Sequence, residues 1–331
     1  MKQELDKPVF LIGMGRGGST MIFEVLAASP ELGWFSRYLN LVPWFPPVAA
    51  LSRLADVHPA LRSSIGRSDQ GGGWTRKLRR VERARLGPNE AYRVWDCCCE
   101  KSFAEGFLAV EAPGPERDRA RALVSKVLRY QGKPRFVAKL TGPPRIAYLS
   151  SIFPDARFVH LIRDGRAVVQ SLLKVPFWKD TFRLREPAWK GALTAEQLGR
   201  WEKLGRPPAA LAALEWRRVI ETARAEATDH APGRYAELRY EDFLGDPHRS
   251  LDEIEDFCEL SRDPKVHAFL ARRYELRNMN AGWRSTLEPA EVEMLEELIG
   301  DLLLELGYEV PYRAGEPAPR RRSARLVRSF A

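Results

Sequence analysis

Residues 9–21 read Val9-Phe10-Leu11-Ile12-Gly13-Met14-Gly15-Arg16-Gly17-Gly18-Ser19-Thr20-Met21. The first four residues form a short apolar run that ends in glycines, a pattern typical of a buried parallel strand entering a tight turn. The spacing of Ile22, Val25 and Leu26 then predicts a helix with one apolar face, which Pro30 ends. The stretch therefore predicts a strand, a glycine-rich loop and a helix in direct succession, which is how an α/β fold begins.

The loop between this strand and helix has the composition of an anion site. Glycines let backbone N–H groups turn toward an anion, and the helix N-terminus adds the positive end of its dipole. Arg16 offers a two-pronged hydrogen bond to phosphate or sulfate, while Ser19 and Thr20 can cap the helix and donate their hydroxyls. The predicted phosphate-binding residues are Arg16, Gly17, Gly18, Ser19, Thr20 and Met21.

Other kinds of glycine-rich loop fit these residues less well. No lysine precedes Ser19, so the loop differs from the phosphate loop of kinases and NTPases, although a P-loop-like nucleotide kinase or NTPase is kept as an alternative. The glycines at 13, 15 and 18 match the dinucleotide fingerprint, but residues 32–37 lack the acid that this fingerprint needs about 20 residues later. A tight turn without a ligand is the simplest alternative.

Strand and helix patterns alternate along the rest of the chain. The predicted strands are Phe136–Ala138, Phe158–Ile162 and Tyr235–Tyr240, and the predicted helices are Arg145–Ile152, a helix ending at Leu173, 209–227 and Pro289–Leu306. Residues 113–119, rich in Pro, Gly and charge, are expected to form a loop. This alternation predicts a P-loop-like, three-layer α/β/α fold around a central parallel sheet. We place this single domain at residues 1–312 and expect the arginine-rich residues 313–331 to be a disordered tail.

The composition narrows the classes of function. The 331 residues carry a net charge of +9, of which the six arginines and one glutamate of the predicted tail supply +5. The remaining +4 suits a polyanionic ligand and gives no reason to expect nucleic acid. Four cysteines, three of them contiguous at 97–99, exclude a disulfide scaffold. No Cys-x-x-Cys or His-x-x-x-His pair is present, so we expect no metal.

Neither the N-terminal residues nor the apolar runs indicate a membrane segment. Residues 1–7 are charged and lack the apolar stretch of a signal peptide, and the apolar runs are too short to cross a bilayer. We therefore expect a cytoplasmic protein without a stable membrane anchor, in a compartment that keeps the cysteines reduced. The sequence leaves the oligomeric state open.

A second anion motif, Arg163-Asp164-Gly165-Arg166-Ala167-Val168-Val169-Gln170-Ser171, follows the strand predicted at 158–162. Arg163 ends the strand, and Ser171 lies about two helical turns further on. Both are expected at the carboxyl edge of the sheet, where open α/β folds bind ligands. The pair can hold a second phosphate, although an Arg-Asp pair is also typical of a surface ion pair or a helix start.

Taken in this order, the two motifs resemble the sulfotransferase family, whose members transfer a sulfuryl group from 3′-phosphoadenosine-5′-phosphosulfate (PAPS). Ile152–Phe158 followed by Arg163–Ala167 is most similar to the tyrosylprotein, membrane-type and related bacterial branches. The resemblance resumes at Leu238–Phe243 and at Asn280–Arg284, whereas residues 34–130 match poorly. Each motif alone is weak evidence for the family, whereas the set of motifs in this order is specific for it.

The resemblance implies how PAPS is bound. The first loop would hold the 5′-phosphosulfate, and Arg163 together with Ser171 would hold the 3′-phosphate. Tyr240 would contact the adenine. The loop that begins at Asn280 would close over the nucleotide.

Catalysis is expected to depend on positioning and on charge stabilisation, as in phosphoryl transfer. The family has a lysine at the end of the second strand and a lysine or arginine in the first loop, and this chain has Lys139 and Arg16 at those positions. The resemblance therefore implies that Lys139 and Arg16 stabilise the sulfuryl and leaving oxygens. The leaving group is a phosphate, which departs easily without a metal.

The general base is where the chain departs from the family. The tyrosylprotein branch has a glutamate shortly after the first helix, where this chain has Ser36 and Arg37, and the Lys-x-His segment of the cytosolic branch is missing. We take Glu90 as the base, with Asp96 and Glu100 as alternatives. If none of the three serves, the chain is a non-catalytic homologue that binds the product nucleotide, 3′-phosphoadenosine-5′-phosphate (PAP).

The acceptor pocket is assigned by elimination to the unmatched residues 34–60 and 71–112, which are rich in Trp, Phe and Pro. Aromatic side chains suit an apolar or aromatic acceptor, so we expect a small molecule or lipid with a hydroxyl or amine. A peptide acceptor and a purely packing role for these segments are the alternatives.

Overall fold

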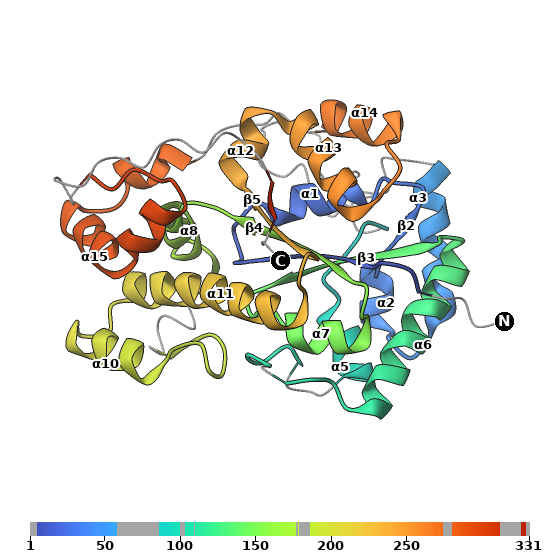
Figure 1. The fold of residues 1–331 in the computed structure, drawn as a ribbon, viewed down its shortest axis with the longest axis horizontal. Coiled ribbons are helices and arrows are strands. Elements are labelled where there is room, and N and C mark those ends of the chain that lie inside the picture. Colours follow the sequence, from blue (N-terminus) through green and yellow to red (C-terminus); the bar gives the residue numbers. More distant parts are fainter. Residues whose placement is uncertain are drawn as a thin grey trace, which may run out of the picture.

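A six-stranded sheet forms the centre of the protein in the computed structural model, which describes residues 5–57, 86–99, 103–108, 110–176, 178, 186–273, 280–311 and 326–328 (Figure 1). The strand order is β2-β3-β1-β4-β5-β6. The first five of these strands run parallel, and β6 pairs antiparallel with β5 at the edge. The strands are β1 (Val9–Gly13), β2 (Leu32–Gly33), β3 (Arg135–Thr141), β4 (Arg157–Ile162), β5 (Tyr235–Arg239) and β6 (Val327–Arg328). The predicted central parallel sheet is therefore confirmed.

Helices cover both faces of the sheet. Those before β4 are α1 (Ser19–Leu26), α2 (Arg37–Leu41), η1 (Pro46–Ser52), α3 (Arg53–Val57), α5 (Tyr92–Cys98), α6 (Gly114–Gln131) and α7 (Ile146–Ile152). Those after β4 are α8 (Gly165–Leu172), α10 (Ala195–Lys203), α11 (Pro208–His230), α12 (Tyr240–Gly245), α13 (Pro247–Cys258), α14 (Pro264–Arg273), η4 (Asn280–Ser285) and α15 (Pro289–Glu305). Both η1 and η4 are 3₁₀ helices.

The alternation of side chains along β1 explains the layers. Phe10 and Ile12 join an apolar cluster with α5, α6 and α7 on one face. Val9 and Leu11 point to the other face and join a cluster with α1, α13 and α14. A strand that is apolar on both sides must be covered on both sides, which gives the predicted three-layer α/β/α architecture.

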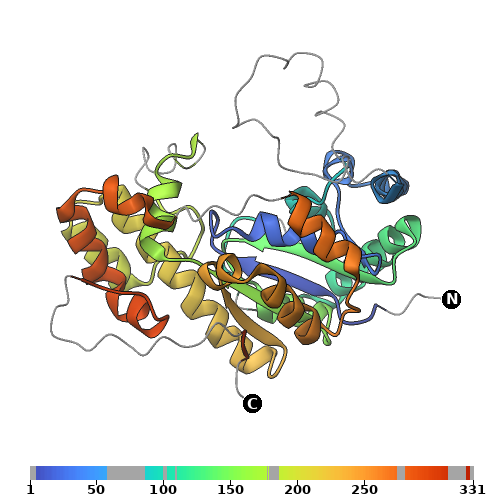
Figure 2. The ribbon, with the colours of Figure 1, turned by 90° about the horizontal axis from the view of Figure 1, so that it is seen from above.

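A third apolar cluster lies outside this sandwich. It joins side chains of α8, α10, α11 and α15, including Leu211, Leu214 and Ile220, which the sequence places on the buried face of their helix. Figures 1 and 2 show α8, α10 and α15 gathered at one end of the molecule, beyond the sheet. The long helix α11 contacts α7, α8 and α15 and so joins this cluster to the sheet.

The prediction of a loop at residues 113–119 is wrong. Pro113 is the N-cap of α6, which begins at Gly114 and carries Pro115 and Glu116 in its first turn. Proline is favoured at a helix start because its missing N–H has no intrahelical partner there, and an acid complements the dipole. The same residues that suggest a loop therefore mark a helix N-terminus.

The predicted tail and the unmatched segment lie largely outside the described residues. Val327 and Arg328 pair with Glu237 and Ala236 of β5, while 312–325 and 329–331 are not described, so the division at residue 312 stays a prediction. Residues 58–85 also lie outside the described part. Within the described part, no helix is long and apolar enough to cross a membrane. All four cysteines are free thiols.

A buried ion-pair network joins α8 to α15. Arg166 on α8 pairs with Glu296 on α15 at 2.5 Å and with the N-cap residue Asp164 at 2.9 Å. The side chains of Arg166 and Glu296 are each 1% exposed. The ring of Trp283 covers the guanidinium at 4.2 Å. Loss of one partner would leave the others charged in a medium that solvates charge poorly.

Glu296→Ala should lower the free energy of unfolding by about 3–5 kcal/mol because it removes one partner of a buried pair. The adjacent Glu297 is the matched control, since it pairs with Arg200 at 3.2 Å but is 72% exposed. Glu297→Ala should cost only about 0–1 kcal/mol. Urea unfolding followed by circular dichroism measures both losses, and equal losses would contradict the structural role given to Arg166.

Candidate active site

The loop between β1 and α1 keeps an open helix N-terminus. Gly13, Arg16 and Gly18 have positive φ angles of 146°, 69° and 89°. Gly18 is the N-cap of α1, and no side chain caps the helix. The expectation that Ser19 and Thr20 cap the helix is therefore wrong. Since the first turn carries no acid either, its N–H groups and dipole are available to an anion.

The two anion motifs meet at the carboxyl edge of the sheet. Arg16 Nε donates to Ser171 Oγ at 2.9 Å, and Arg163 donates to the Arg16 carbonyl oxygen, also at 2.9 Å. The loop after β1 and the strand end of β4 are neighbours because β1 pairs with β4. The cations and hydroxyl of both predicted phosphate sites thus form one continuous surface.

Tyr240 lies against the loop. A Cβ atom at Gly18 would approach two ring carbons of Tyr240 to 2.4 Å, so only glycine allows this contact. The Arg163 guanidinium lies 5.0 Å from the centre of the same ring. Tyr240 is the first residue of α12, which starts where β5 ends, and this places the ring at the carboxyl edge with the two motifs.

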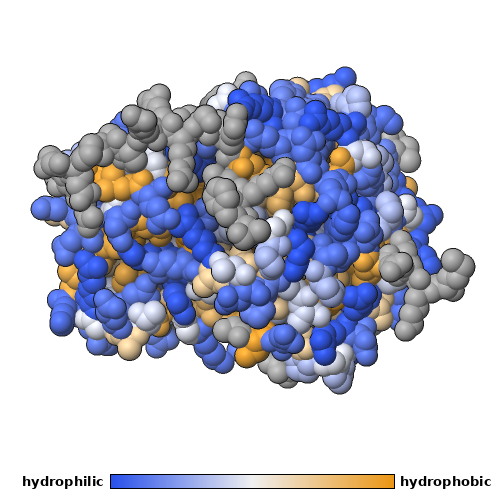
Figure 3. Space-filling view, in the orientation of Figure 1, coloured by the Kyte–Doolittle hydropathy of each residue, from blue (hydrophilic) through white to orange (hydrophobic). Residues whose placement is uncertain are grey.

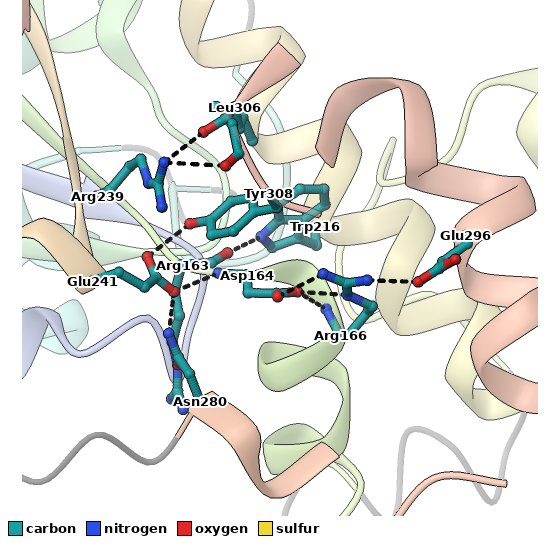
Figure 4. A network of polar contacts seen from close by, with 11 residues as sticks. Arg163, Asp164, Arg166, Trp216, Arg239, Glu241, Asn280, Glu296, Leu306 and Tyr308 are labelled. Atoms are coloured by element: carbon teal, nitrogen blue, oxygen red, sulfur yellow. Dashed lines mark hydrogen bonds and ion pairs between the residues drawn. The ribbon is translucent and has the colours of Figure 1, made fainter. Parts of the chain in front are cut away.

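Asn280 joins the site through Arg163 and Glu241. Its Oδ1 accepts from Arg163 Nε at 2.7 Å, and its Nδ2 donates to Glu241 (Figure 4). Glu241 also accepts from the Asp164 N–H at 3.1 Å and from the Tyr308 hydroxyl at 2.8 Å. Burial raises the pKa of Glu241. Sequence reasoning missed this carboxyl, although it lies within the motif Leu238–Phe243 that carries the resemblance.

Lys139 lies on the other side of the loop from Arg163, at the end of β3. Its Nζ donates to Thr20 Oγ1 at 2.8 Å and pairs with Glu90 Oε1 at 2.7 Å. The second Glu90 oxygen accepts from Thr141 Oγ1 at 2.8 Å. The Tyr92 hydroxyl donates to the Thr141 carbonyl at 2.7 Å, and burial raises the pKa of this phenol, which keeps it protonated.

Glu90 reaches Lys139 because its segment pairs with the chain that follows β2. Pro88 forms an isolated antiparallel bridge with Ser36, and the Asn89 N–H donates to the Phe35 carbonyl at 2.8 Å. Ser36 is where the resembling tyrosylprotein branch has its glutamate. This chain brings a carboxylate to the same neighbourhood from another segment.

A cavity of about 360 Å³ opens beside Lys139 and Glu90. Its other lining residues come from α1, α2 and residues 88–93; they are Thr20, Phe23, Asn40, Pro88, Asn89, Ala91, Tyr92 and Arg93. The cavity is therefore made partly by the segments that the sequence assigns to the acceptor.

The structure brings most of the predicted site residues together. Arg16–Thr20, Lys139, Arg163, Ser171, Tyr240 and Asn280 meet at the carboxyl edge, with Glu90 beside Lys139. Met21 packs with the apolar cluster of α1. Asp96 lies on α5 and does not line the cavity, while Glu100 is outside the described residues.

A parallel sheet, a glycine-rich loop at a helix N-terminus and three cations at the carboxyl edge define a P-loop-like α/β fold with the features of a polyanion site. A sequence model of the sulfotransferase family matches residues 8–264. The chain therefore belongs to the sulfotransferase family. The prediction of a PAPS-dependent sulfotransferase is confirmed at the level of the family and the fold.

Comparison with known proteins supports this assignment over nearly the whole chain. The omega-hydroxy-beta-dihydromenaquinone-9 sulfotransferase Stf3 of Mycobacterium bovis is 22% identical, over 92% of this chain and 76% of its own. Carbohydrate sulfotransferase 2 of Mus musculus is 28% identical over 47% of this chain and 35% of its own. The crystal structure of sulfotransferase STF9 from Mycobacterium avium matches with a TM-score of 0.55 and 16% identity, over 93% of this chain and 78% of its own, which shows the shared fold.

Gly18→Ala should lower the free energy of unfolding by about 1–3 kcal/mol, because alanine is strained in the left-handed backbone of this position and its Cβ collides with Tyr240. Gly15→Ala is the control, since no atom lies within 4 Å of its added Cβ. This change should alter the free energy by no more than about 0.5 kcal/mol. Thermal and urea unfolding of both variants measure the difference, and an undisturbed Gly18→Ala protein would refute the contact with Tyr240.

Proposed function

We propose that this sulfotransferase binds PAPS across both anion motifs and transfers the sulfuryl group to a hydroxyl of an apolar, lipid-like acceptor that enters beside Glu90. The observation that carries the proposal is the contact between the two motifs: Arg163 donates to the backbone of Arg16, and Arg16 donates to Ser171. One ligand with two phosphate groups would span them.

The chemistry of the side chains fits a doubly anionic nucleotide. Arg16 and Arg163 offer planar guanidinium groups, which suit phosphate oxygens, and Lys139 offers a compact ammonium. Thr20, in the first turn of α1, and Ser171, in the last turn of α8, add hydroxyl donors. The 5′-phosphosulfate is assigned to the loop and the 3′-phosphate to Arg163 and Ser171, as the resemblance implies.

Tyr240 supports the position of the adenine. Its ring is half-buried and packs on Gly18 at the end of β5, beside the Arg163 guanidinium. An aromatic face next to a phosphate-binding arginine is a natural platform for a base. Asn280 holds Arg163 through its amide oxygen. We assign η4, which begins at Asn280, to the cover of the nucleotide.

The transfer step requires charge stabilisation and removal of one proton. The acceptor oxygen forms a bond to sulfur while the bond between sulfur and the bridging phosphate oxygen breaks, and PAP leaves with that electron pair. Lys139 and Arg16 would stabilise the negative charge on the sulfuryl and leaving oxygens. The acceptor proton passes to the Glu90 carboxylate.

The contacts of Glu90 suit a base. One oxygen pairs with Lys139 and the other accepts from Thr141, so the carboxylate has a fixed orientation at the cavity wall. Its side chain is 24% exposed, which leaves it accessible to an acceptor. The family base is missing at Ser36, and Glu90 is held next to Ser36 by the bridge at Pro88.

An apolar patch beside the cavity supports a lipid-like acceptor. Helix α2 supplies Asn40 to the cavity and Leu41 to the surface. Five of the eight exposed large hydrophobic side chains among the described residues lie in the segment 41–54, which begins on α2, and Trp44 is 73% exposed. The patch consists of Leu41, Trp44, Phe45, Leu51 and Leu54. Exposed apolar side chains gathered next to a cavity are typical of a binding site for an apolar ligand.

The relative Stf3 is named for a hydroxylated dihydromenaquinone. A long apolar molecule with a terminal hydroxyl matches the arrangement in this protein. The patch would hold the apolar part of the acceptor, and the cavity would admit only its reacting end. We therefore place a long-chain hydroxyl compound first among acceptors.

Glu90→Gln should lower kcat for a long-chain primary alcohol by about 10²–10⁴-fold, because the neutral amide cannot take the proton. The loss should be much smaller with p-nitrophenol at about pH 8, since this acceptor is already ionised and needs no base. Release of PAP measures both rates. Binding of PAP should be unchanged.

Asp96→Asn is the matched control and should keep full activity with both acceptors. If Glu90→Gln lowers kcat equally with the alcohol and with p-nitrophenolate, Glu90 acts by positioning Lys139 and not as the base. Full activity of Glu90→Gln would refute its role altogether.

Trp44→Ser combined with Phe45→Ser should raise KM for a long-chain alcohol by about tenfold, because roughly 1.4 kcal/mol of apolar contact is lost. The kcat/KM for p-nitrophenol should not change. Leu204→Ser is the control, because Leu204 is exposed to 41% at a distant helix end, after α10. A KM that stays constant in the double variant would exclude the patch as the acceptor surface.

A further inference from the structure

Helices α13 and α14 bring two carboxylates and a histidine together. His267 Nε2 on α14 lies 3.4 Å from Asp252 Oδ1 and 3.5 Å from Glu255 Oε2, both on α13. All three ligand atoms lie within 4.8 Å of one another. The three residues are on helices that carry none of the residues assigned to sulfuryl transfer.

These separations fit a shared cation better than hydrogen bonds. A hydrogen bond from N–H to oxygen brings the two atoms to about 2.7–3.2 Å. A tetrahedral metal with bonds of about 2.0–2.2 Å holds neighbouring ligand atoms roughly 3.3–3.6 Å apart. The two distances from His267 fall in the second range.

The burial of the Glu255 carboxylate is the observation that points to a ligand. The residue is only 2% exposed, and its Oε2 faces the cluster. Among the described residues this oxygen accepts no hydrogen bond of ordinary length, and the group that faces it is His267 Nε2 at 3.5 Å. A buried carboxylate oxygen without a hydrogen bond is costly, and a bound metal ion removes that cost.

His248 lies where it can fix the tautomer of His267. The two rings stack with centroids 5.3 Å apart, and their Nδ1 atoms are 2.9 Å from each other. One Nδ1 must carry the proton of this hydrogen bond. When His267 donates it, the lone pair of His267 Nε2 points at Asp252 and Glu255, which is the form that binds a metal.

We propose that Asp252, Glu255 and His267 form a site for a divalent transition metal such as Zn²⁺, with His248 as the outer partner that orients His267. Three protein ligands leave a fourth position for water. The ion would join α13 to α14. Helix α14 packs on α1, which directly follows the glycine-rich loop of the first anion motif. Its role is therefore structural.

The surroundings of the site admit an ion from solvent. Figure 3 shows a hydrophilic surface over the α13–α14 part of the molecule. Asp252 is 37% exposed, so the site has one accessible ligand. Arg262 is a neighbouring cation, and its Nε lies 3.9 Å from Asp252 Oδ1. This arginine has a stronger partner in Asp256 at 2.6 Å, which leaves Asp252 able to bind the ion.

The test is a titration of the chelator-treated full chain with Co²⁺. We expect uptake of one ion per chain, with the strong visible absorption of four-coordinate cobalt and no thiolate charge-transfer band, which separates this site from the free cysteines. Asp252→Asn and His267→Gln, both close in shape to the original residues, should weaken binding at least tenfold. His230→Gln on α11 is the control and should bind as the wild type does.

A second measurement keeps the proposal independent of catalysis. Zn²⁺ should raise the melting temperature of the wild type and of His230→Gln, because it binds only the folded chain, and should leave His267→Gln unchanged. No uptake of cobalt by the wild type would overturn the site. Uptake that persists in both Asp252→Asn and His267→Gln would do the same, because the ion would then be held elsewhere.

Discussion

The position of the Arg163 guanidinium is the constraint on which the donor site depends. Arg163 follows β4, a strand held between β1 and β5, so its backbone is fixed on both sides. Its side chain binds the carbonyl of Arg16 in the first loop and the amide of Asn280 in η4. One side chain on a rigid strand end therefore positions two irregular segments, which lack a hydrogen-bond ladder of their own.

The layer behind Arg163 explains why this position is stable. Trp216 donates to the Arg163 carbonyl at 3.1 Å, and Glu241 collects donors from Asp164, Asn280 and Tyr308 (Figure 4). Trp216, Asp164 and Tyr308 are buried, so their hydrogen bonds satisfy polar groups that water hardly reaches. The cations of the proposed nucleotide site can thus point outward while their backbone is held from behind. At the proposed acceptor cavity, Lys139 and Glu90 hold each other in place as an ion pair.

How far the sequence predicts the site depends on the range of the contacts involved. Arg163 and Lys139 are predictable because each follows an apolar strand, and parallel strands bring their carboxyl ends to one edge. The contact of Glu90 with Lys139 cannot be predicted from the sequence, because it depends on pairing between two irregular segments, at Phe35–Ser36 and at residues 88–89. Glu241 is missed for a related reason, since the sequence does not show that an acid after a strand is buried. The start of α6 is misjudged because Pro and Gly mark both loops and helix starts.

The central claim is that the two anion motifs form one nucleotide site, and calorimetric titration with PAP tests it most directly. Wild type and Arg157→Ala should bind PAP, since Arg157 lies at the far end of the same strand. Arg163→Ala should bind it about 10–100-fold more weakly, the loss expected for a hydrogen bond to a charged phosphate. ATP and NAD, which lack the 3′-phosphate, should bind far less tightly than PAP to the wild type. Equal binding of PAP and ATP, or full affinity in Arg163→Ala, would contradict the account.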